Sequence, residues 1–72
     1  MASLPNRLKE LRKAEGVTQK VMAESLEILE QHYQKIEYGK INPTQDKLIK
    51  LADFFDVSTD YLLGRSDNPA RQ

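Results

Sequence analysis

The sequence predicts an all-α fold in which five short helices pack around one core. Apolar residues recur every three or four positions through most of the chain, which is the spacing of one helix face. Threonine or serine precedes three of these periodic segments and glycine follows three of them, as helix caps do. No segment shows the alternation typical of a strand, and a chain of 72 residues forms at most one domain.

The first helix is expected over residues 4–15. Pro5 is compatible with it, because the first turn of a helix has no partner for the missing N–H. Gly16 ends the pattern. The expected apolar face comprises Leu4, Leu8, Leu11 and Ala14.

Two helices are expected next, over residues 19–26 and 30–38. Thr18 is a good N-cap for the first of them, and Gly39 is a natural end for the second. Residues 27–29 leave room only for a tight turn, and two short helices joined in this way are typical of a helix-turn-helix. The expected inward residues are Val21, Met22, Ala23 and Leu26, then Tyr33 and Ile36.

The last two expected helices are a segment over residues 45–55 capped by Thr44 and a short segment capped by Ser58 or Thr59. Gly64 closes the fifth helix. The folded domain is therefore expected to span residues 1–64. Residues 65–72 are polar and are expected to form a disordered tail.

Composition argues against several classes of protein. The chain has no cysteine and a single histidine, so neither a disulfide, a metal site nor a cofactor is expected. No nucleophile-base set or phosphate-binding glycine loop is present, and so short a chain rarely builds a deep cleft, so we expect no enzyme and no small-molecule substrate. The apolar runs are too short to span a membrane, and no secretory signal is evident, which favours a cytoplasmic protein.

The charge of the chain is zero overall but unevenly distributed. Eleven basic residues balance eleven acidic ones. Residues 1–20 carry five basic and two acidic side chains, a local +3, whereas residues 41–60 carry two basic and four acidic ones, a local −2. Binding to nucleic acid depends on where cationic side chains gather rather than on their sum. The first 20 residues are therefore the candidate cationic surface.

The residue pattern resembles the phage Cro and lysogeny-repressor helix-turn-helix family over about residues 6–64. No single element is specific, but their combination is. The matching elements are Gly16-Val17-Thr18-Gln19, Ala23, Leu26, Ile36-Glu37, Gly39-Lys40, Pro43, Leu48-Ile49-Lys50-Leu51-Ala52, Val57-Ser58 and Asp60-Tyr61-Leu62-Leu63-Gly64. The resemblance implies a repressor-like five-helix domain whose second and third helices bind DNA.

The resemblance also implies contact residues. In this family the second helix of the motif enters the major groove, so residues that read base edges are expected to be Glu30, Gln31, Gln34 and Lys35. Contacts to the phosphate backbone are expected from Thr18, Gln19, Lys20, Tyr38, Lys40 and Asn42. A plain solvated helix face is the alternative for each of them, and for Glu30 a favourable interaction with the helix dipole.

Arg12 and Glu37 match a pair that forms an internal salt bridge in several relatives, so their expected role is structural. The turn departs from the family pattern at two positions. Glu27 stands where glycine is usual, and Leu29 stands where a capping Ser or Thr is usual. Either the turn is rebuilt, or the third helix starts at a shifted position.

The expected function is a sequence-specific regulator of transcription. A repressor that occupies an operator in double-stranded DNA as a homodimer, associated with the nucleoid, fits best. Tyr61 and Leu62 are expected either to form the dimer surface or to complete the monomer core. The alternative function is a protein-interaction module on the same fold, such as an antitoxin or anti-repressor with weak or no DNA binding; zero net charge favours it.

Overall fold

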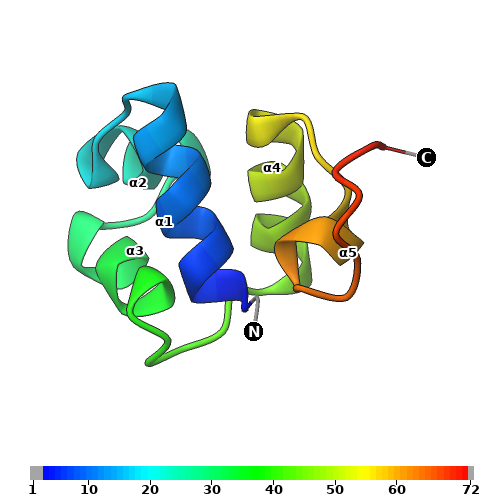
Figure 1. Ribbon diagram of the computed structural model, residues 1–72. Coiled ribbons are helices and arrows are strands. Elements are labelled where there is room, and N and C mark those ends of the chain that lie inside the picture. Colours follow the sequence, from blue (N-terminus) through cyan, green and yellow to red (C-terminus); the bar gives the residue numbers. More distant parts are fainter. Residues whose placement is uncertain (1–2, 72) are drawn as a thin grey trace.

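The computed structural model describes residues 3–71, and within them five helices surround one apolar core (Figure 1). Their bounds are α1 Leu4–Glu15, α2 Gln19–Leu26, α3 Glu30–Glu37, α4 Gln45–Phe55 and α5 Thr59–Leu62. In Figure 1, α2 and α3 lie on one side of α1, while α4 and α5 lie on the other. The predicted fold class and all five helices are confirmed, and α3 is one residue shorter than expected because Tyr38 is its C-cap. None of these helices is long and apolar enough to cross a membrane.

Helix starts follow from side-chain caps. The side chains of Thr18, Thr44 and Ser58 each accept a hydrogen bond from the backbone N–H three residues later. This confirms the first two predicted caps and selects Ser58 over Thr59 for α5. Ser3 caps α1 in the same way, a role the sequence did not reveal.

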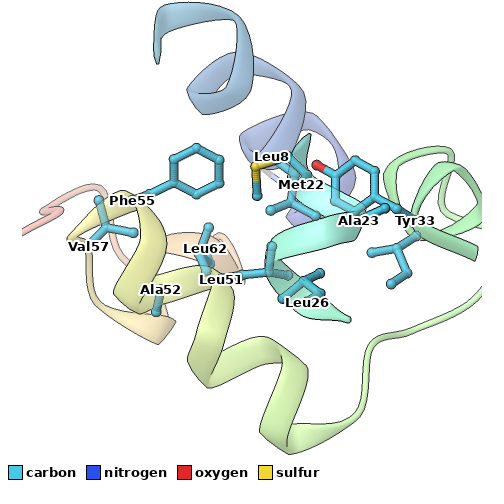
Figure 2. Packing of buried hydrophobic residues seen from close by; sticks show 11 residues of the cluster. Leu8, Met22, Ala23, Leu26, Tyr33, Leu51, Ala52, Phe55, Val57 and Leu62 are labelled. Carbon is cyan, nitrogen blue, oxygen red and sulfur yellow. The ribbon is translucent and has the colours of Figure 1, made fainter. Parts of the chain in front are cut away.

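The core joins all five helices, as Figure 2 shows for its labelled members. Two expected inward residues are wrong: Val21 is 42 % exposed, and Ala14 is also exposed. On α2 the buried face comprises Met22, Ala23 and Leu26. Val21 lies one position before Met22 and therefore points away from that face, toward solvent. The buried apolar residues are Leu8, Met22, Ala23, Leu26, Tyr33, Ile36, Leu51, Ala52, Phe55, Val57 and Leu62.

The turn between α2 and α3 keeps its family geometry in spite of its residues. Glu27 adopts the left-handed conformation, with φ 58° and ψ 41°. The next N–H, of Ile28, donates to the carbonyl of Ala23 at 3.0 Å, so the end of α2 is closed as a glycine would close it. Helix α3 begins at Glu30, as expected, and Leu29 occupies the N-cap position without a capping hydrogen bond. The turn is therefore neither rebuilt nor shifted, and Glu27 and Leu29 both lower its stability relative to the usual residues.

Residues 65–71 lie back against α4 and α5, whereas the sequence predicts a disordered tail from residue 65. The guanidinium of Arg7 donates to the carbonyl of Ser66 at 3.3 Å and to the carboxylate of Asp67 at 2.9 Å. Arg71 donates to the carbonyl of Ala52 at 3.2 Å, and the N–H of Ser58 donates to the carbonyl of Pro69 at 3.0 Å. Two arginines supply donors that connect this segment to the helical domain.

The structure decides between the two roles expected for Tyr61 and Leu62 in favour of the monomer core. Leu62 is fully buried in the monomer core, so it is not available to a second copy. The ring of Tyr61 lies under the guanidinium of Arg7, with 3.8 Å between the guanidinium carbon and the ring centroid. Leu63, 40 % exposed, is the apolar side chain that this end of the domain still presents to solvent.

Candidate nucleic-acid interface

A shallow hollow of about 650 Å³ lies where α1, the start of α2 and α3 meet. We call it the basic hollow, because four of the side chains that line it are cationic. Two carboxylates also line it, and one of them is fully paired within the protein, as described below. The lining residues are Lys9, Arg12, Lys13, Val17, Thr18, Gln19, Lys20, Glu30, Glu37 and Tyr38.

The start of α2 presents polar backbone groups to this hollow. Thr18 accepts from the N–H of Val21 through its hydroxyl and from the N–H of Met22 through its carbonyl. The N–H groups of Gln19 and Lys20 precede these first bonds, so they remain available as donors. The partial positive charge at a helix N-terminus adds to the lysine charges. This end of α2 is chemically suited to an anionic oxygen.

Beneath the hollow, Arg12 and Glu37 form the predicted salt bridge. The Nε and Nη2 atoms of Arg12 each lie 2.9 Å from a different carboxylate oxygen of Glu37, which is the two-pronged arrangement expected of a guanidinium. Nη1 donates to the carbonyl of Val17 at 3.2 Å, so the same side chain also fixes the entry to α2. The side chain of Glu37 is fully buried, and the side chain of Arg12 is 15 % exposed.

Gln19 joins this network. Its Nε2 donates to Oε1 of Glu37 at 3.2 Å. Burial alone would raise the pKa of Glu37, but the hydrogen bonds from Arg12 and Gln19 outweigh it and hold the pKa below the ordinary value. The hydrogen bonds that Arg12 donates to the Glu37 carboxylate also raise the pKa of Arg12. Because Nε2 carries two hydrogens, Gln19 keeps one donor for a ligand while Glu37 fixes its orientation.

Tyr33 lies beside the same network. Its side chain is fully buried, and its hydroxyl has no hydrogen-bond partner among residues 3–71. Burial, together with the neighbouring Glu37 carboxylate, raises the pKa of Tyr33 far above its usual range. Tyr33 is thus a core residue, as its apolar position in the pattern predicted.

The outer face of α3 carries the residues expected to read bases. Gln31 and Lys35 are exposed, and Gln34 is half-buried. Gln34 donates to the carboxylate of Glu30 at 3.5 Å, one turn earlier on the helix. Glu30 also lines the basic hollow, so it stands between the hollow and the remaining residues of this face.

The residues expected to contact phosphates divide into two groups. Thr18, Gln19, Lys20 and Tyr38 line the basic hollow together, and Tyr38 is 57 % exposed. Lys40 and Asn42 are exposed in the loop after α3 and lie outside it. The N–H of Lys40 donates to the carbonyl of Lys35 at 2.8 Å, which ties that loop to the end of α3.

Sequence reasoning missed Lys9 and Lys13 as members of this site. Both line the basic hollow from α1, and neither makes an ion pair with the described part of the chain. A signal was present, since the first 20 residues carry the local excess of positive charge and these two lysines are four positions apart, hence on one helix face. The helix-turn-helix pattern itself starts later, at Gly16, and so does not include α1.

Comparison with known proteins gives the family. Residues 8–62 match the protein family described as helix-turn-helix. The chain is 45 % identical over 65 residues to the HTH-type transcriptional regulator ImmR of Bacillus subtilis strain 168, covering 90 % of this chain and 51 % of ImmR. It is 40 % identical over 62 residues to the cryptic phage CTXphi transcriptional repressor RstR of Vibrio cholerae, covering 86 % and 55 %. The chain spans about half the length of such relatives.

Two solved structures share the fold. The P22 c2 repressor, determined in complex with a synthetic operator, superposes with a TM-score of 0.84 at 20 % identity, over 92 % of this chain and all of the other. The restriction-modification controller protein C.AhdI of Aeromonas hydrophila superposes with a TM-score of 0.75 at 28 % identity, over 83 % of this chain and 91 % of the other. These likenesses confirm the repressor-like arrangement expected from the sequence. The chain belongs to the helix-turn-helix family.

Proposed function

We propose that this chain binds double-stranded DNA in a sequence-specific way and represses transcription by occupying an operator. The observation that carries the proposal is the basic hollow, whose lysines and free α2 amides adjoin the exposed face of α3. With the DNA backbone seated in the hollow, α3 enters the major groove. The activity is binding alone, with no chemical step, and its place in the cell is the nucleoid in the cytoplasm.

The proposed contacts follow the two roles that such interfaces separate. Phosphate contacts, which position the protein, come from the hollow and from the loop after α3, through Thr18, Gln19, Lys20, Tyr38, Lys40 and Asn42, with Lys9 and Lys13 added. Base contacts come from the start and the outer face of α3, through Glu30, Gln31, Gln34 and Lys35. The folded unit that does this is proposed to be residues 1–64, with the segment after it packed against α4 and α5.

A homodimer completes the proposal. One helix of eight residues reaches few base pairs, so useful discrimination requires two half-sites. Names of relatives support the regulatory role: ImmR is a transcriptional regulator and RstR a transcriptional repressor. The P22 c2 repressor, which shares the fold, was crystallised on an operator.

The deciding experiment is selection of bound sequences from a pool of random duplexes, followed by titration of the selected duplex at several salt concentrations. We expect an enriched motif with two related halves and an affinity that falls steeply with salt, because phosphate contacts release counterions. Substituting Gln31→Ala or Lys35→Ala should change the preferred bases. No enrichment, together with tight salt-insensitive binding to a protein, would instead establish the interaction-module alternative.

A further inference from the structure

The apolar side chain at the tip of α3 has no structural role within the domain. Leu29 is 76 % exposed, more than any other large apolar side chain among residues 3–71. It occupies the N-cap position of α3 and makes no side-chain hydrogen bond there. It therefore neither packs into the core nor caps its helix.

Leu29 is the exception among the helix starts of this chain. The N-caps of the other four helices are Ser3, Thr18, Thr44 and Ser58, and the side chain of each accepts a capping hydrogen bond. Leucine cannot accept the hydrogen bond that a serine would accept. The start of α3 therefore lacks the capping hydrogen bond that stabilises the other four helices. Local rules that are broken without a structural return are typical of functional positions.

The position of Leu29 at the start of α3 indicates which group its side chain contacts. The N-terminal residues of the recognition helix contact base edges in the major groove, and Leu29 is followed directly by the exposed Glu30 and Gln31. Among the four bases, thymine alone presents a methyl group in that groove. Resting on the proposed function, we propose that Leu29 recognises the C5-methyl group of a thymine in the operator.

A protein partner is a poorer occupant of this position. Stable interfaces bury about 800 Å² on each side. The side chains that follow Leu29, those of Glu30, Gln31 and His32, are polar and exposed, so the apolar surface here amounts to one side chain. A single leucine surrounded by hydrogen-bonding groups matches a single methyl group between base edges.

The test uses a change in the DNA that removes only this methyl group. In the selected operator each thymine is replaced in turn by deoxyuridine, and affinity is measured by fluorescence anisotropy for the wild type and for Leu29→Ser. For one thymine in each half-site, we expect the wild type to bind the deoxyuridine duplex about fourfold more weakly, equivalent to about 0.8 kcal/mol for one methyl group. The Leu29→Ser variant should bind both duplexes equally.

The controls separate this inference from folding and from the proposed function. Leu29→Ser supplies a cap, so its unfolding midpoint should equal or exceed that of the wild type. Ile49→Ser changes another exposed apolar side chain, 45 % exposed on α4, and should keep the fourfold preference for thymine. The inference is overturned if the wild type binds its operator but no thymine shows a methyl effect that Leu29→Ser removes. If the wild type selects no DNA sequence at all, the proposed function fails instead.

Discussion

At the scale of single residues, Glu37 connects the core to the basic hollow. One buried carboxylate accepts hydrogen bonds from Arg12 on α1 and from Gln19 on α2 while it sits at the end of α3. One buried carboxylate thus joins the three helices that line the basic hollow. Removing either charge leaves the other buried and unpaired, which costs more than the pair contributes.

Arg12→Met is therefore expected to lower the free energy of unfolding by about 3–5 kcal/mol. Small domains have total stabilities of roughly 5–15 kcal/mol, so the variant should be close to unfolding at 37 °C. Urea titration followed by circular dichroism measures the change. The matched control is Arg71→Met, which removes an exposed pair with Asp53 and should shift the midpoint little. Full DNA affinity and an unchanged midpoint for Arg12→Met would refute the structural role.

The lowered pKa of Glu37 predicts a particular response to acid. A carboxylate whose pKa is lower in the folded state than in the unfolded state stabilises the fold at pH values above its ordinary pKa of 4.5. That contribution is lost as the pH falls through the lower folded-state pKa. We expect the stability of the wild type to fall more steeply than that of Glu37→Gln when urea midpoints are compared from pH 7 to pH 3. Parallel curves would show that Glu37 is not the linked group.

The sequence revealed part of this residue-level picture. The Arg12–Glu37 bridge was predictable, because both residues match a known pair. The inward bond of Gln19 was not, because a glutamine at the start of a helix can point to solvent or to a neighbour with equal ease. Lys9 and Lys13 were missed because they lie outside the motif, although the local charge was visible.

At the scale of elements, the turn between α2 and α3 stores the strain of the motif. Glu27 is a non-glycine residue with a positive φ of 58°, and Asp56 at the end of α4 is similar with 54°. Both residues end a helix in the conformation that glycine adopts most readily. The strain persists because the helices on each side of the turn are packed into one core.

Glu27→Gly is expected to raise the free energy of unfolding by about 1 kcal/mol, because glycine carries no penalty for the left-handed conformation. Thermal and urea unfolding measure the gain. The same substitution at Glu24, an exposed position inside α2, is the control and should cost about 1 kcal/mol. A loss of stability at both positions would mean that the turn is not strained at Glu27.

Lys13→Gln tests the contribution of α1 to the basic hollow. If Lys13 meets a phosphate, the slope of log affinity against log salt concentration should fall by about 1, and binding should weaken about equally for all sequences. Lys50→Gln on α4 makes the same change in charge outside the hollow and should leave the slope unaltered. Equal effects of the two substitutions would show that only the total charge matters.

Helix positions were the most predictable feature at this scale. Apolar spacing and caps placed α1, α2 and α4 at their observed bounds. Periodicity failed at Val21, because it identifies a face but cannot rank two neighbours at its edge. Composition alone cannot place residues 65–71, because their contacts involve Arg7, far away in sequence, and Arg71.

At the scale of the whole molecule, the helices with the proposed DNA contacts and the last two helices occupy different sides of the domain. Helices α2 and α3 lie on one side of α1, and α4 and α5 lie on the other (Figure 1). Because Leu62 is buried in the core, the second copy of the proposed homodimer has to contact side chains that remain exposed, such as Leu63. A symmetric pair of such domains presents two α3 helices to one face of the duplex.

Spacing of the half-sites is the corresponding prediction. Inserting 5 base pairs between the halves of the selected operator turns one half to the opposite face of the duplex, since a turn of B-DNA is about 10 base pairs. We expect affinity to fall toward that of a single half-site in a gel-shift titration. A duplex with one half-site scrambled gives the reference value. Unchanged affinity after the insertion would show that the domains bind independently.

The uneven charge of this neutral chain also bears on the proposed approach to DNA. Lysines gather around the basic hollow, while Asp53, Asp56 and Asp60 belong to α4 and α5 on the other side of α1. Such a molecule is an electric dipole without a net charge, and the duplex exerts a torque on it rather than a long-range pull. Salt confines that torque to about 8–10 Å. In the proposed complex, the charge asymmetry therefore orients the protein only close to the duplex, with the basic hollow toward the phosphates.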